Sequence, residues 1–218
     1  MSAAPARSDR QRLRFPGVRA PKPLLSAEAE GRLSARQLEL LERLDEQVAA
    51  ARLATMTMAE IAAEANCSLR TLYGISPSKD ELVLTVVDRR LHRIGRAAIE
   101  SLDASKSPLE ILRAYLRAAN EAVQPEAVFL AHHLTEIPGA GRLLDAHEDY
   151  VMAVTKSLLD RALAAGQIDP VDTASLAHVL GGLGREFGRP EVAELASRPA
   201  KETADGIADV ILRGLERR

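Results

Sequence analysis

Histidine and acidic side chains are the first candidates for chemistry in this chain. His132 and Glu136 would lie four residues apart on one face of a helix, with His133 beside them. Such a group makes a poor metal site when neither an HExxH motif nor a pair of cysteines accompanies it. The sequence also contains no glycine-rich phosphate loop after a strand and no nucleophile elbow. We therefore expect no catalytic residue, no metal and no cofactor, and an enzyme dependent on His132 or His147 is the least supported hypothesis.

A second set of side chains, close together in the sequence, suits hydrogen bonding to DNA. Arg70 can make a bidentate contact to guanine, and Thr71 can touch a thymine methyl group or a phosphate. Tyr73 and Lys79 are suited to backbone contacts, which position a protein on DNA without reading its sequence. These contacts require a helix that presents its N-terminal residues to the major groove.

The stretch Thr57–Leu82 predicts that helix, because it contains three helix starts in succession. Thr57 and Glu60 form a capping box, in which the hydroxyl accepts from the N3 amide and the carboxylate reaches back. Ser68 begins a second, short helix, and Ser78 begins a third with a glutamate at N3.

Only Asn66 and Cys67 separate the first of these helices from the second. Two short helices joined by so tight a turn must cross, which is the helix-turn-helix arrangement. Leu72 can face the inside of this pair, so the other residues of the short helix point elsewhere. Cys67 is expected to be an inert core thiol.

The same stretch resembles the DNA-binding motif of TetR-family transcriptional regulators. The resemblance rests on Thr57, Ile61, Ala62, Ala65, Ser68, Thr71, Leu72, Tyr73, Ser78, Lys79, Asp80, Glu81 and Leu82. It extends from Ser34 to about Ile94, and the remainder matches the family only in helical character and length.

Two departures from the family pattern stand out. Asn66 replaces the usual glycine of the turn, and asparagine tolerates the left-handed conformation that a tight turn needs. After Tyr73 the family favours aromatic or histidine residues, where this chain has Gly74, Ile75 and Ser76. The residues that we expect at the DNA are Thr57, Ser68, Leu69, Arg70, Thr71, Tyr73, Gly74 and Lys79.

Composition narrows the class of protein. The chain has 218 residues, 3% aromatic residues, a formal net charge of −2 and one cysteine. One cysteine excludes an intramolecular disulfide and fits a reducing cytoplasm. No apolar run approaches the length of a membrane span, and the N-terminus lacks a secretory segment.

The segment 1–33 is rich in proline and carries an excess of positive charge. We expect a flexible basic arm, with one helical turn after Ser26. Such an arm could bind DNA, by attracting its phosphates or by entering a minor groove. The alternative is a disordered tail without a role. The excess lies in residues 1–22, where one acid, Asp9, stands against six basic residues: Arg7, Arg10, Arg12, Arg14, Arg19 and Lys22.

The rest of the chain predicts an all-α fold in two domains. Residues 34–80 form the helix-turn-helix domain, whose first helix begins at Ser34 with Gln37 at N3. Residues 81–218 form a helical effector-binding and dimerisation domain. The helix from Ser78 is apolar on more than one side, so it should link the two. Later helices are expected at 107–123, 124–135, 140–165, from Asp169, and at 203–215.

Two of the expected helices have a predicted orientation. The helix from Ser34 should expose an acid-rich face, formed by Glu39, Glu42, Asp45 and Glu46. The last helix should direct Ile207, Val210, Ile211 and Leu215 inward.

Five glycines lie within the last two expected helices, at a cost of roughly 1 kcal/mol each relative to alanine. They are Gly181, Gly182, Gly184, Gly206 and Gly214. They indicate a two-fold interface in which helices approach closely. Alternatively, Gly181, Gly182 and Gly184 mark a break in the helix that begins at Asp169. We favour the interface, because reading a palindromic operator requires a homodimer.

The resemblance also implies an apolar cavity for a small-molecule effector between helices of the second domain. The candidate ligand residues are polar or aromatic ones among aliphatic neighbours, and each could instead be plain core. They are Tyr115, Phe129, His133, His147 and Tyr150.

The sequence thus favours a ligand-responsive regulator of transcription, a repressor that binds double-stranded operator DNA as a dimer. The alternative is a helical small-molecule-binding or scaffold protein whose DNA reader is degenerate, an interpretation that rests on Gly74, Ile75 and Ser76. We expect a cytoplasmic protein without a membrane partner.

Overall fold

The computed structural model describes residues 13–47, 50–123, 134 and 136–217. Within these ranges the regular structure is helical, apart from one isolated β-bridge between Ile168 and Glu216. The expectation of an all-α fold is therefore confirmed. None of the described helices combines the length and apolar character that crossing a bilayer requires.

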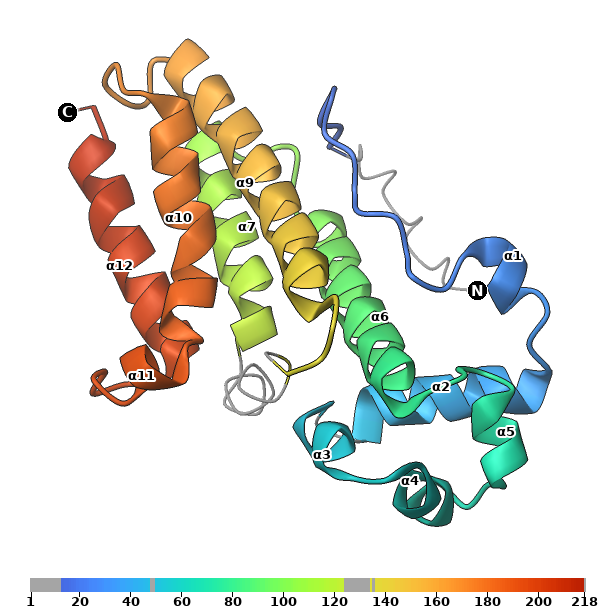
Figure 1. The fold of residues 1–218 in the computed structure, drawn as a ribbon. Coiled ribbons are helices and arrows are strands. Elements are labelled where there is room, and N and C mark those ends of the chain that lie inside the picture. Colours follow the sequence, from blue (N-terminus) through green and yellow to red (C-terminus); the bar gives the residue numbers. More distant parts are fainter. Residues whose placement is uncertain (1–12, 48–49, 124–133, 135, 218) are drawn as a thin grey trace, which may run out of the picture.

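A small unit of short helices lies at one end of the molecule (Figure 1). Its elements are α1 (Ala27–Glu30), α2 (Ala35–Gln47), α3 (Ala50–Thr55), α4 (Met58–Glu64) and α5 (Leu69–Tyr73). The expected helix starts are present: Thr57 and Glu60 form the capping box of α4, and Ser34 exchanges hydrogen bonds with Gln37 at the start of α2. The helical turn after Ser26 is α1.

Longer helices form the other part of the molecule, where α7, α9, α10 and α12 run side by side (Figure 1). The elements are α6 (Lys79–Glu100), α7 (Pro108–Ala119), the 3-10 helix η1 (Asn120–Val123), α9 (Ala140–Ala164), α10 (Thr173–Phe187), α11 (Pro190–Ala193) and α12 (Ala200–Leu215). Ser107 and Glu110 form a second capping box at α7. The helix expected over 124–135 falls largely outside the described residues.

Two expectations for individual residues were wrong. The cap of α10 is Asp172 and not Asp169, because the Asp172 carboxylate accepts from the amides of Ala174 and Ser175. On α12 the buried positions include Ala204, Ala208 and Leu212, while Val210 is 64% exposed. Small alanines there let α12 lie close to its neighbours, which shifts the buried stripe.

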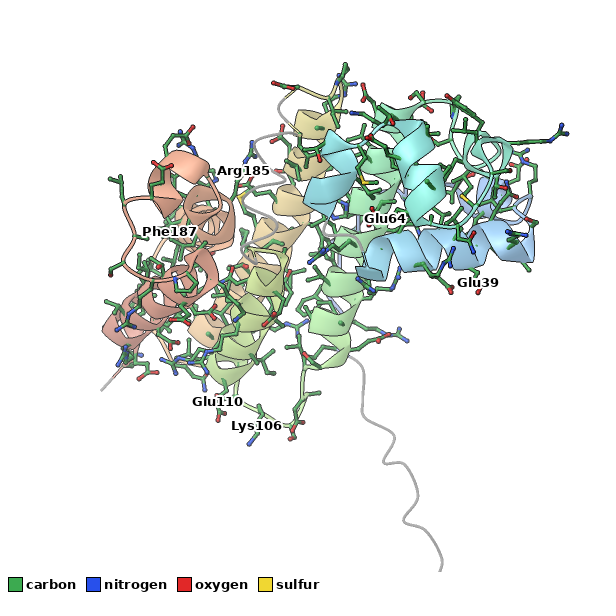
Figure 2. The ribbon with its side chains drawn as sticks, turned by 90° about the horizontal axis from the view of Figure 1, so that it is seen from below. Glu39, Glu64, Lys106, Glu110, Arg185 and Phe187 are labelled. Atoms are coloured by element: carbon green, nitrogen blue, oxygen red, sulfur yellow. The ribbon has the colours of Figure 1, made fainter. Side chains whose placement is uncertain are left out.

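The expected solvated acidic face of α2 is only partly exposed. Glu39 projects from the outside of that helix (Figure 2). Asp45 is buried instead, with its carboxylate 3.1 Å from Nη2 of Arg93 on α6. This ion pair ties the small unit to α6.

Two clusters of buried residues form the cores, and two helices contribute to both. The first core joins α2–α5 to Leu82, Val83 and Val86 of α6. The second core lies among α7, α9, α10 and α12 and receives Ala98 from α6. α6 therefore links the two cores, as the sequence predicted. α9 does the same, with Leu143 in the first core and Leu158 in the second, which the sequence did not indicate.

Part of the segment expected as an arm is seen to lie along α6 and α9 (Figure 1). Leu13, Phe15 and Val18 pack against the second core. The amide of Leu24 donates to Oδ2 of Asp88 at 2.8 Å. Residues 13–25 thus cover the body of helices, whereas residues 1–12 of the expected arm, which include Arg7, lie outside the described residues.

Candidate DNA-reading helix and ligand cavity

α5 has one buried side chain and otherwise faces outward. Leu72 is fully buried in the first core, whereas Leu69 and Tyr73 are 42% and 53% exposed. Arg70 is also exposed. Ser68 caps the helix, since its hydroxyl accepts from the amide of Thr71 at 3.1 Å. A five-residue helix held by one leucine and a cap leaves its remaining surface available to a partner.

Four of the residues expected at DNA also make hydrogen bonds within the small unit. Thr57 closes the capping box of α4, and Ser68 caps α5. Nζ of Lys79 donates to the carbonyl oxygen of Ala54 at 2.9 Å, so its ammonium group stabilises the end of α3. The hydroxyl of Thr71 is hydrogen-bonded to that of Ser68 at 2.9 Å.

The residues after Tyr73 fit the small unit well. A Cβ on Gly74 would lie 2.5 Å from Nε2 of Gln37, which donates to the carbonyl oxygen of Thr71 at 3.4 Å. Ile75 packs against the first core, and Ser76 is 3% exposed. The departure from the family pattern therefore has a packing reason in this chain.

The turn between α4 and α5 follows the expectation from sequence. Asn66 has φ of 48°, the left-handed conformation that asparagine tolerates. Cys67 is half-buried, and this burial raises the pKa of its thiol despite the nearby Arg43 and Arg36. The thiol is therefore protonated and weakly nucleophilic at neutral pH.

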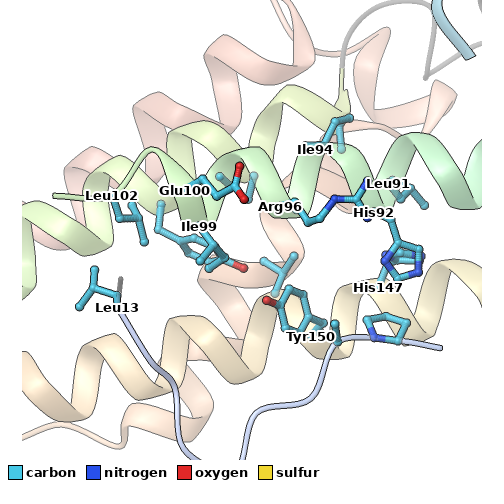
Figure 3. Close-up of a pocket in the computed structure, with 18 residues that line it drawn as sticks. Leu13, Leu91, His92, Ile94, Arg96, Ile99, Glu100, Leu102, His147 and Tyr150 are labelled. Carbon is cyan, nitrogen blue, oxygen red and sulfur yellow. The ribbon is translucent and has the colours of Figure 1, made fainter. Parts of the chain in front are cut away.

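A cavity of about 460 Å³ lies between α6, α7, α9 and the N-terminal segment (Figure 3). Three of the five expected ligand residues, Tyr115, His147 and Tyr150, line it. Phe129 and His133 lie outside the described residues. His92 and Arg96 of α6 also line the cavity and were not expected; much of the wall comes from the half of α6 that begins at Leu91.

The two tyrosines that line the cavity have neutral phenols at pH 7. Tyr115 is 1% exposed, and burial raises the pKa of its phenol well above the ordinary value. Burial also raises the pKa of Tyr150, which is half-buried. The cavity wall is thus apolar with a few hydrogen-bonding groups, as small-molecule sites are.

Asp88 and two histidines form a polar cluster at one end of the cavity. Asp88 is 1% exposed, and its Oδ1 lies 3.0 Å from Nε2 of His147 and 3.4 Å from Nε2 of His92. Burial by itself would raise the pKa of Asp88, but the hydrogen bonds from His147 and Leu24 and the two nearby imidazoles hold it below its ordinary value.

The pKa of His92 is lowered, chiefly because the ring is buried and next because His147 and Arg96 lie near it, against the opposing effect of Asp88. The two imidazole rings meet edge to face, with centroids 4.8 Å apart and an interplanar angle of 74°. The spacing of Asp88 and His92, four residues apart on one helix, was the available sequence signal. His147 comes from α9, so only the fold completes the cluster.

The helical glycines have two different explanations. A Cβ on Gly181 would lie 2.7 Å from Cγ and 3.2 Å from Cα of Met152, so this glycine allows α10 to approach α9 within the chain. By contrast, Gly206 and Gly214 face open space, with no atom within 4 Å of a built Cβ among the described residues. On the same helix Val210 is 64% exposed, and on α10 Val179 is 50% exposed.

Solved structures of other proteins share the fold of this chain. Neither the known family models nor the curated proteins contain a match to this chain. Among solved structures, a TetR-family regulator from Agrobacterium tumefaciens has a TM-score of 0.64 at 16% identity, covering 83% of this chain and 100% of its own. PfmR, a TetR-family regulator from Thermus thermophilus, has a TM-score of 0.57 at 22% identity, covering 82% and 99%.

A third neighbour, AibR, was solved in complex with isovaleryl coenzyme A and operator DNA. It has a TM-score of 0.55 at 19% identity, covering 80% of this chain and 97% of its own. These likenesses extend across both groups of helices, whereas the sequence motif covers only the first. The chain therefore has the fold of TetR-family transcriptional regulators, a helix-turn-helix unit followed by a helical domain.

Proposed function

We propose that this protein is a ligand-responsive transcriptional repressor that binds a palindromic operator as a homodimer. The observation that carries the proposal is the position of the cavity. It lies between α6 and α9, and both helices also contribute to the core that holds α5. The exposed face of α5, with Arg70 and Tyr73, is the proposed DNA-reading surface.

A ligand in the cavity would act through those two helices. The half of α6 that begins at Leu91 lines the cavity, and Leu82–Val87 of the same helix pack against the helix-turn-helix unit. A packed helix moves as a rigid element, so a shift at one end is transmitted to the other. In a dimer the two α5 helices must lie about 34–36 Å apart to reach successive major grooves. A shift of a few ångströms breaks that register.

The proposed dimer interface is the outer face of α10 and α12. Gly206, Val210 and Gly214 follow one another at four-residue spacing on α12 and so share one face. Open space beside both glycines and exposure of Val210 support close packing with a second copy in a four-helix arrangement.

The structural neighbours agree with both proposed partners. AibR is described with operator DNA and with isovaleryl coenzyme A, so a protein of this fold can hold a small molecule and DNA together. The effector proposed here is a small molecule that fills an apolar cavity with tyrosine, histidine and arginine groups on its wall. Gly74, Ile75 and Ser76 fit the small unit, so they do not disturb its packing. The alternative of a degenerate reader rests on the DNA contacts that these three residues do not supply.

Selection of bound sites from random DNA tests the DNA-binding part. The expected result is a palindromic sequence whose half-sites are about one helical turn apart. Recovery of no enriched sequence would contradict the proposal and favour a small-molecule-binding or scaffold protein.

A cavity-filling substitution tests the switch without knowledge of the effector. Gly95 lines the cavity, and a Cβ there would meet only Cε1 of Tyr150, at 3.9 Å, among the described residues. We expect Gly95→Leu to occupy part of the cavity and weaken operator binding at least about tenfold, since coupling energies of roughly 1–3 kcal/mol are typical. The matched control is Gly141→Leu, at an exposed position of α9 with no atom within 4 Å. Equal affinity of both variants and the unmodified protein in a gel shift would contradict the coupling.

A further inference from the structure

We propose that Asp88, His92 and His147 bind a divalent transition-metal ion at the end of the cavity. Asp88 and His92 lie one turn apart on α6, and His147 faces them from α9. Their candidate ligand atoms all lie within 4.8 Å of one another. The inference goes beyond the proposed function, because metal binding by these three residues requires neither DNA nor an organic effector.

The two separations from the Asp88 oxygen approach those of an occupied site, and all three ligand atoms lie within 4.8 Å of one another. With metal–ligand bonds of about 2.0–2.2 Å, a tetrahedral ion separates its ligand atoms by about 3.3–3.6 Å. Oδ1 of Asp88 lies 3.0 Å from Nε2 of His147 and 3.4 Å from Nε2 of His92. Figure 3 shows His92 and His147 together at one end of the cavity. Their rings already meet edge to face, and rotations of the two rings would admit an ion between their nitrogens and the Asp88 oxygen.

One ligand atom lacks any other role. Nε2 of His92 is buried and, within the described part of the chain, has no hydrogen-bond partner. It faces the Asp88 oxygen at 3.4 Å without forming a hydrogen bond. If that nitrogen is unprotonated, its lone pair faces a carboxylate oxygen, which is unfavourable. A cation between them removes that repulsion and satisfies the buried nitrogen, whose isolation otherwise costs free energy.

The second oxygen of the carboxylate is already held. Oδ2 of Asp88 accepts from the amide of Leu24 at 2.8 Å. This hydrogen bond fixes the orientation of the carboxylate, as the outer hydrogen bonds of metal-bound carboxylates do. Oδ1 is hydrogen-bonded to Nε2 of His147 and would exchange that bond for the metal, with the His147 proton moved to Nδ1 or released. The N-terminal segment would therefore be tied to the ion through Asp88.

The donor set selects the class of metal. Two imidazole nitrogens and one carboxylate oxygen suit Zn²⁺, Co²⁺, Ni²⁺ or Fe²⁺, whereas Mg²⁺ and Ca²⁺ prefer oxygen ligands alone. The described residues offer three ligands, so at least one coordination position remains for water or another small ligand. Because His92 and His147 line the cavity, that position opens toward it.

Titration of the metal-free, full-length protein with Co²⁺ tests the site. Visible absorption of Co²⁺ reports its ligands directly, and competition with Zn²⁺ gives the affinity of that ion. We expect one Co²⁺ ion per chain. Asp88→Asn, His92→Ala and His147→Ala should each weaken binding by more than about 100-fold, because loss of even an outer-shell partner costs about 10–100-fold.

Two controls separate this site from adventitious binding. His178→Ala removes an exposed histidine of α10 whose Nδ1 lies near the sulfur of Met152. The double variant His132→Ala, His133→Ala removes the adjacent pair considered in the sequence. Both should bind Co²⁺ as the unmodified protein does. The proposal would be overturned if either control lost Co²⁺ binding while the three site variants retained it. Absence of Co²⁺ binding by the unmodified protein would also overturn it.

Thermal unfolding guards against a variant that binds no metal only because it does not fold. We expect Zn²⁺ to raise the Tm of the unmodified protein and of both controls. It should leave the Tm of a folded His92→Gln variant unchanged, since glutamine conserves much of the volume but not the imidazole ligand. An equal Zn²⁺-dependent rise in Tm for His92→Gln would contradict the assignment of His92 as a ligand.

Discussion

Single residues decide what α5 can present to a partner. Leu72 is the one side chain of the helix that is fully buried, and Ser68 fixes its start. Arg70 therefore projects from a helix whose position is set by its neighbours. The five donors of a guanidinium group match the O6 and N7 acceptors of guanine, which gives Arg70 the largest capacity for base recognition on this surface.

Arg70→Ala is expected to relax base preference at one position of each half-site. The loss should amount to about 1–3 kcal/mol against the preferred operator and much less against other sequences. Gel shifts with matched and mismatched operators measure the difference. Arg198→Ala, an exposed arginine before α12, is the control and should leave both affinities unchanged. A uniform loss for all sequences with Arg70→Ala would instead assign it a phosphate contact.

Packing between elements sets how closely the long helices approach. Gly181 brings α10 against the backbone of Met152 on α9, where a Cβ would have its nearest atoms at 2.7, 3.2 and 3.3 Å. Two of those three atoms, Cα and N of Met152, belong to the backbone and cannot rotate away. Close contact here keeps α9 fixed on the second core while its other end reaches the first.

Gly181→Ala should therefore destabilise the protein, although alanine favours a helix. Overpacking typically costs about 1–3 kcal/mol, which exceeds the gain in helix propensity of up to about 1 kcal/mol. Chemical denaturation measures the change in the free energy of unfolding. Gly141→Ala is the matched control, with no atom within 4 Å, and should be neutral or slightly stabilising. Stabilisation by both substitutions would show that α9 and α10 can separate without loss.

The capping boxes make the stability of single helices dependent on pH. The Glu60 carboxylate accepts hydrogen bonds from the amide and the hydroxyl of Thr57, and these bonds lower the pKa of Glu60. A lowered pKa means that the charged form is favoured in the folded state. Its stabilisation is present above the ordinary pKa and is lost as pH falls through the lowered, folded-state value.

Glu60→Gln is expected to reduce the loss of stability in acid. Glutamine keeps an acceptor for the Thr57 amide but does not titrate. The unmodified protein should be the more stable near pH 7, and the difference should shrink below about pH 4.5, the ordinary pKa of glutamate. Thermal unfolding at several pH values measures this. A difference in stability that stays constant with pH would show that the charge of Glu60 has no part in the cap.

At the scale of the whole molecule, the cavity and the two cores share α6 and α9. The first core holds the helix-turn-helix unit, the second holds the bundle, and the cavity lies beside the same two helices. A ligand in the cavity, or the proposed metal ion between Asp88, His92 and His147, would change the distance between α6 and α9. A second copy would then be required to convert that movement into a change of half-site spacing.

Val210→Lys is expected to prevent formation of the proposed dimer. A buried lysine in the proposed interface would be desolvated without a partner, which disfavours association. Light scattering should give twice the chain mass of 23.6 kDa for the unmodified protein and a mass close to 23.6 kDa for the variant. Leu195→Lys, at a position that is 85% exposed, is the control and should remain dimeric. A dimeric Val210→Lys would exclude this face of α12 from the interface.

Most of the local structure is encoded in short stretches of the chain. Helix starts depend on hydrogen bonds over three or four residues, so Thr57 with Glu60 and Ser107 with Glu110 could be recognised directly. Asn66 at the tight turn and the apolar faces of α6 followed from the same short-range rules. The all-α fold and the outward position of Arg70 are consequences of this information.

Contacts between residues far apart in the sequence followed from the arrangement of the helices. His147 joins Asp88 and His92 because α9 lies beside α6, and no local pattern specifies that pairing. Gly181 proved to serve contact with Met152 inside the chain, while Gly206 and Gly214 face open space. The physical reason is that helix capping is encoded within one turn of chain. Helix packing depends instead on the fit of whole surfaces, to which residues far apart in the sequence contribute together.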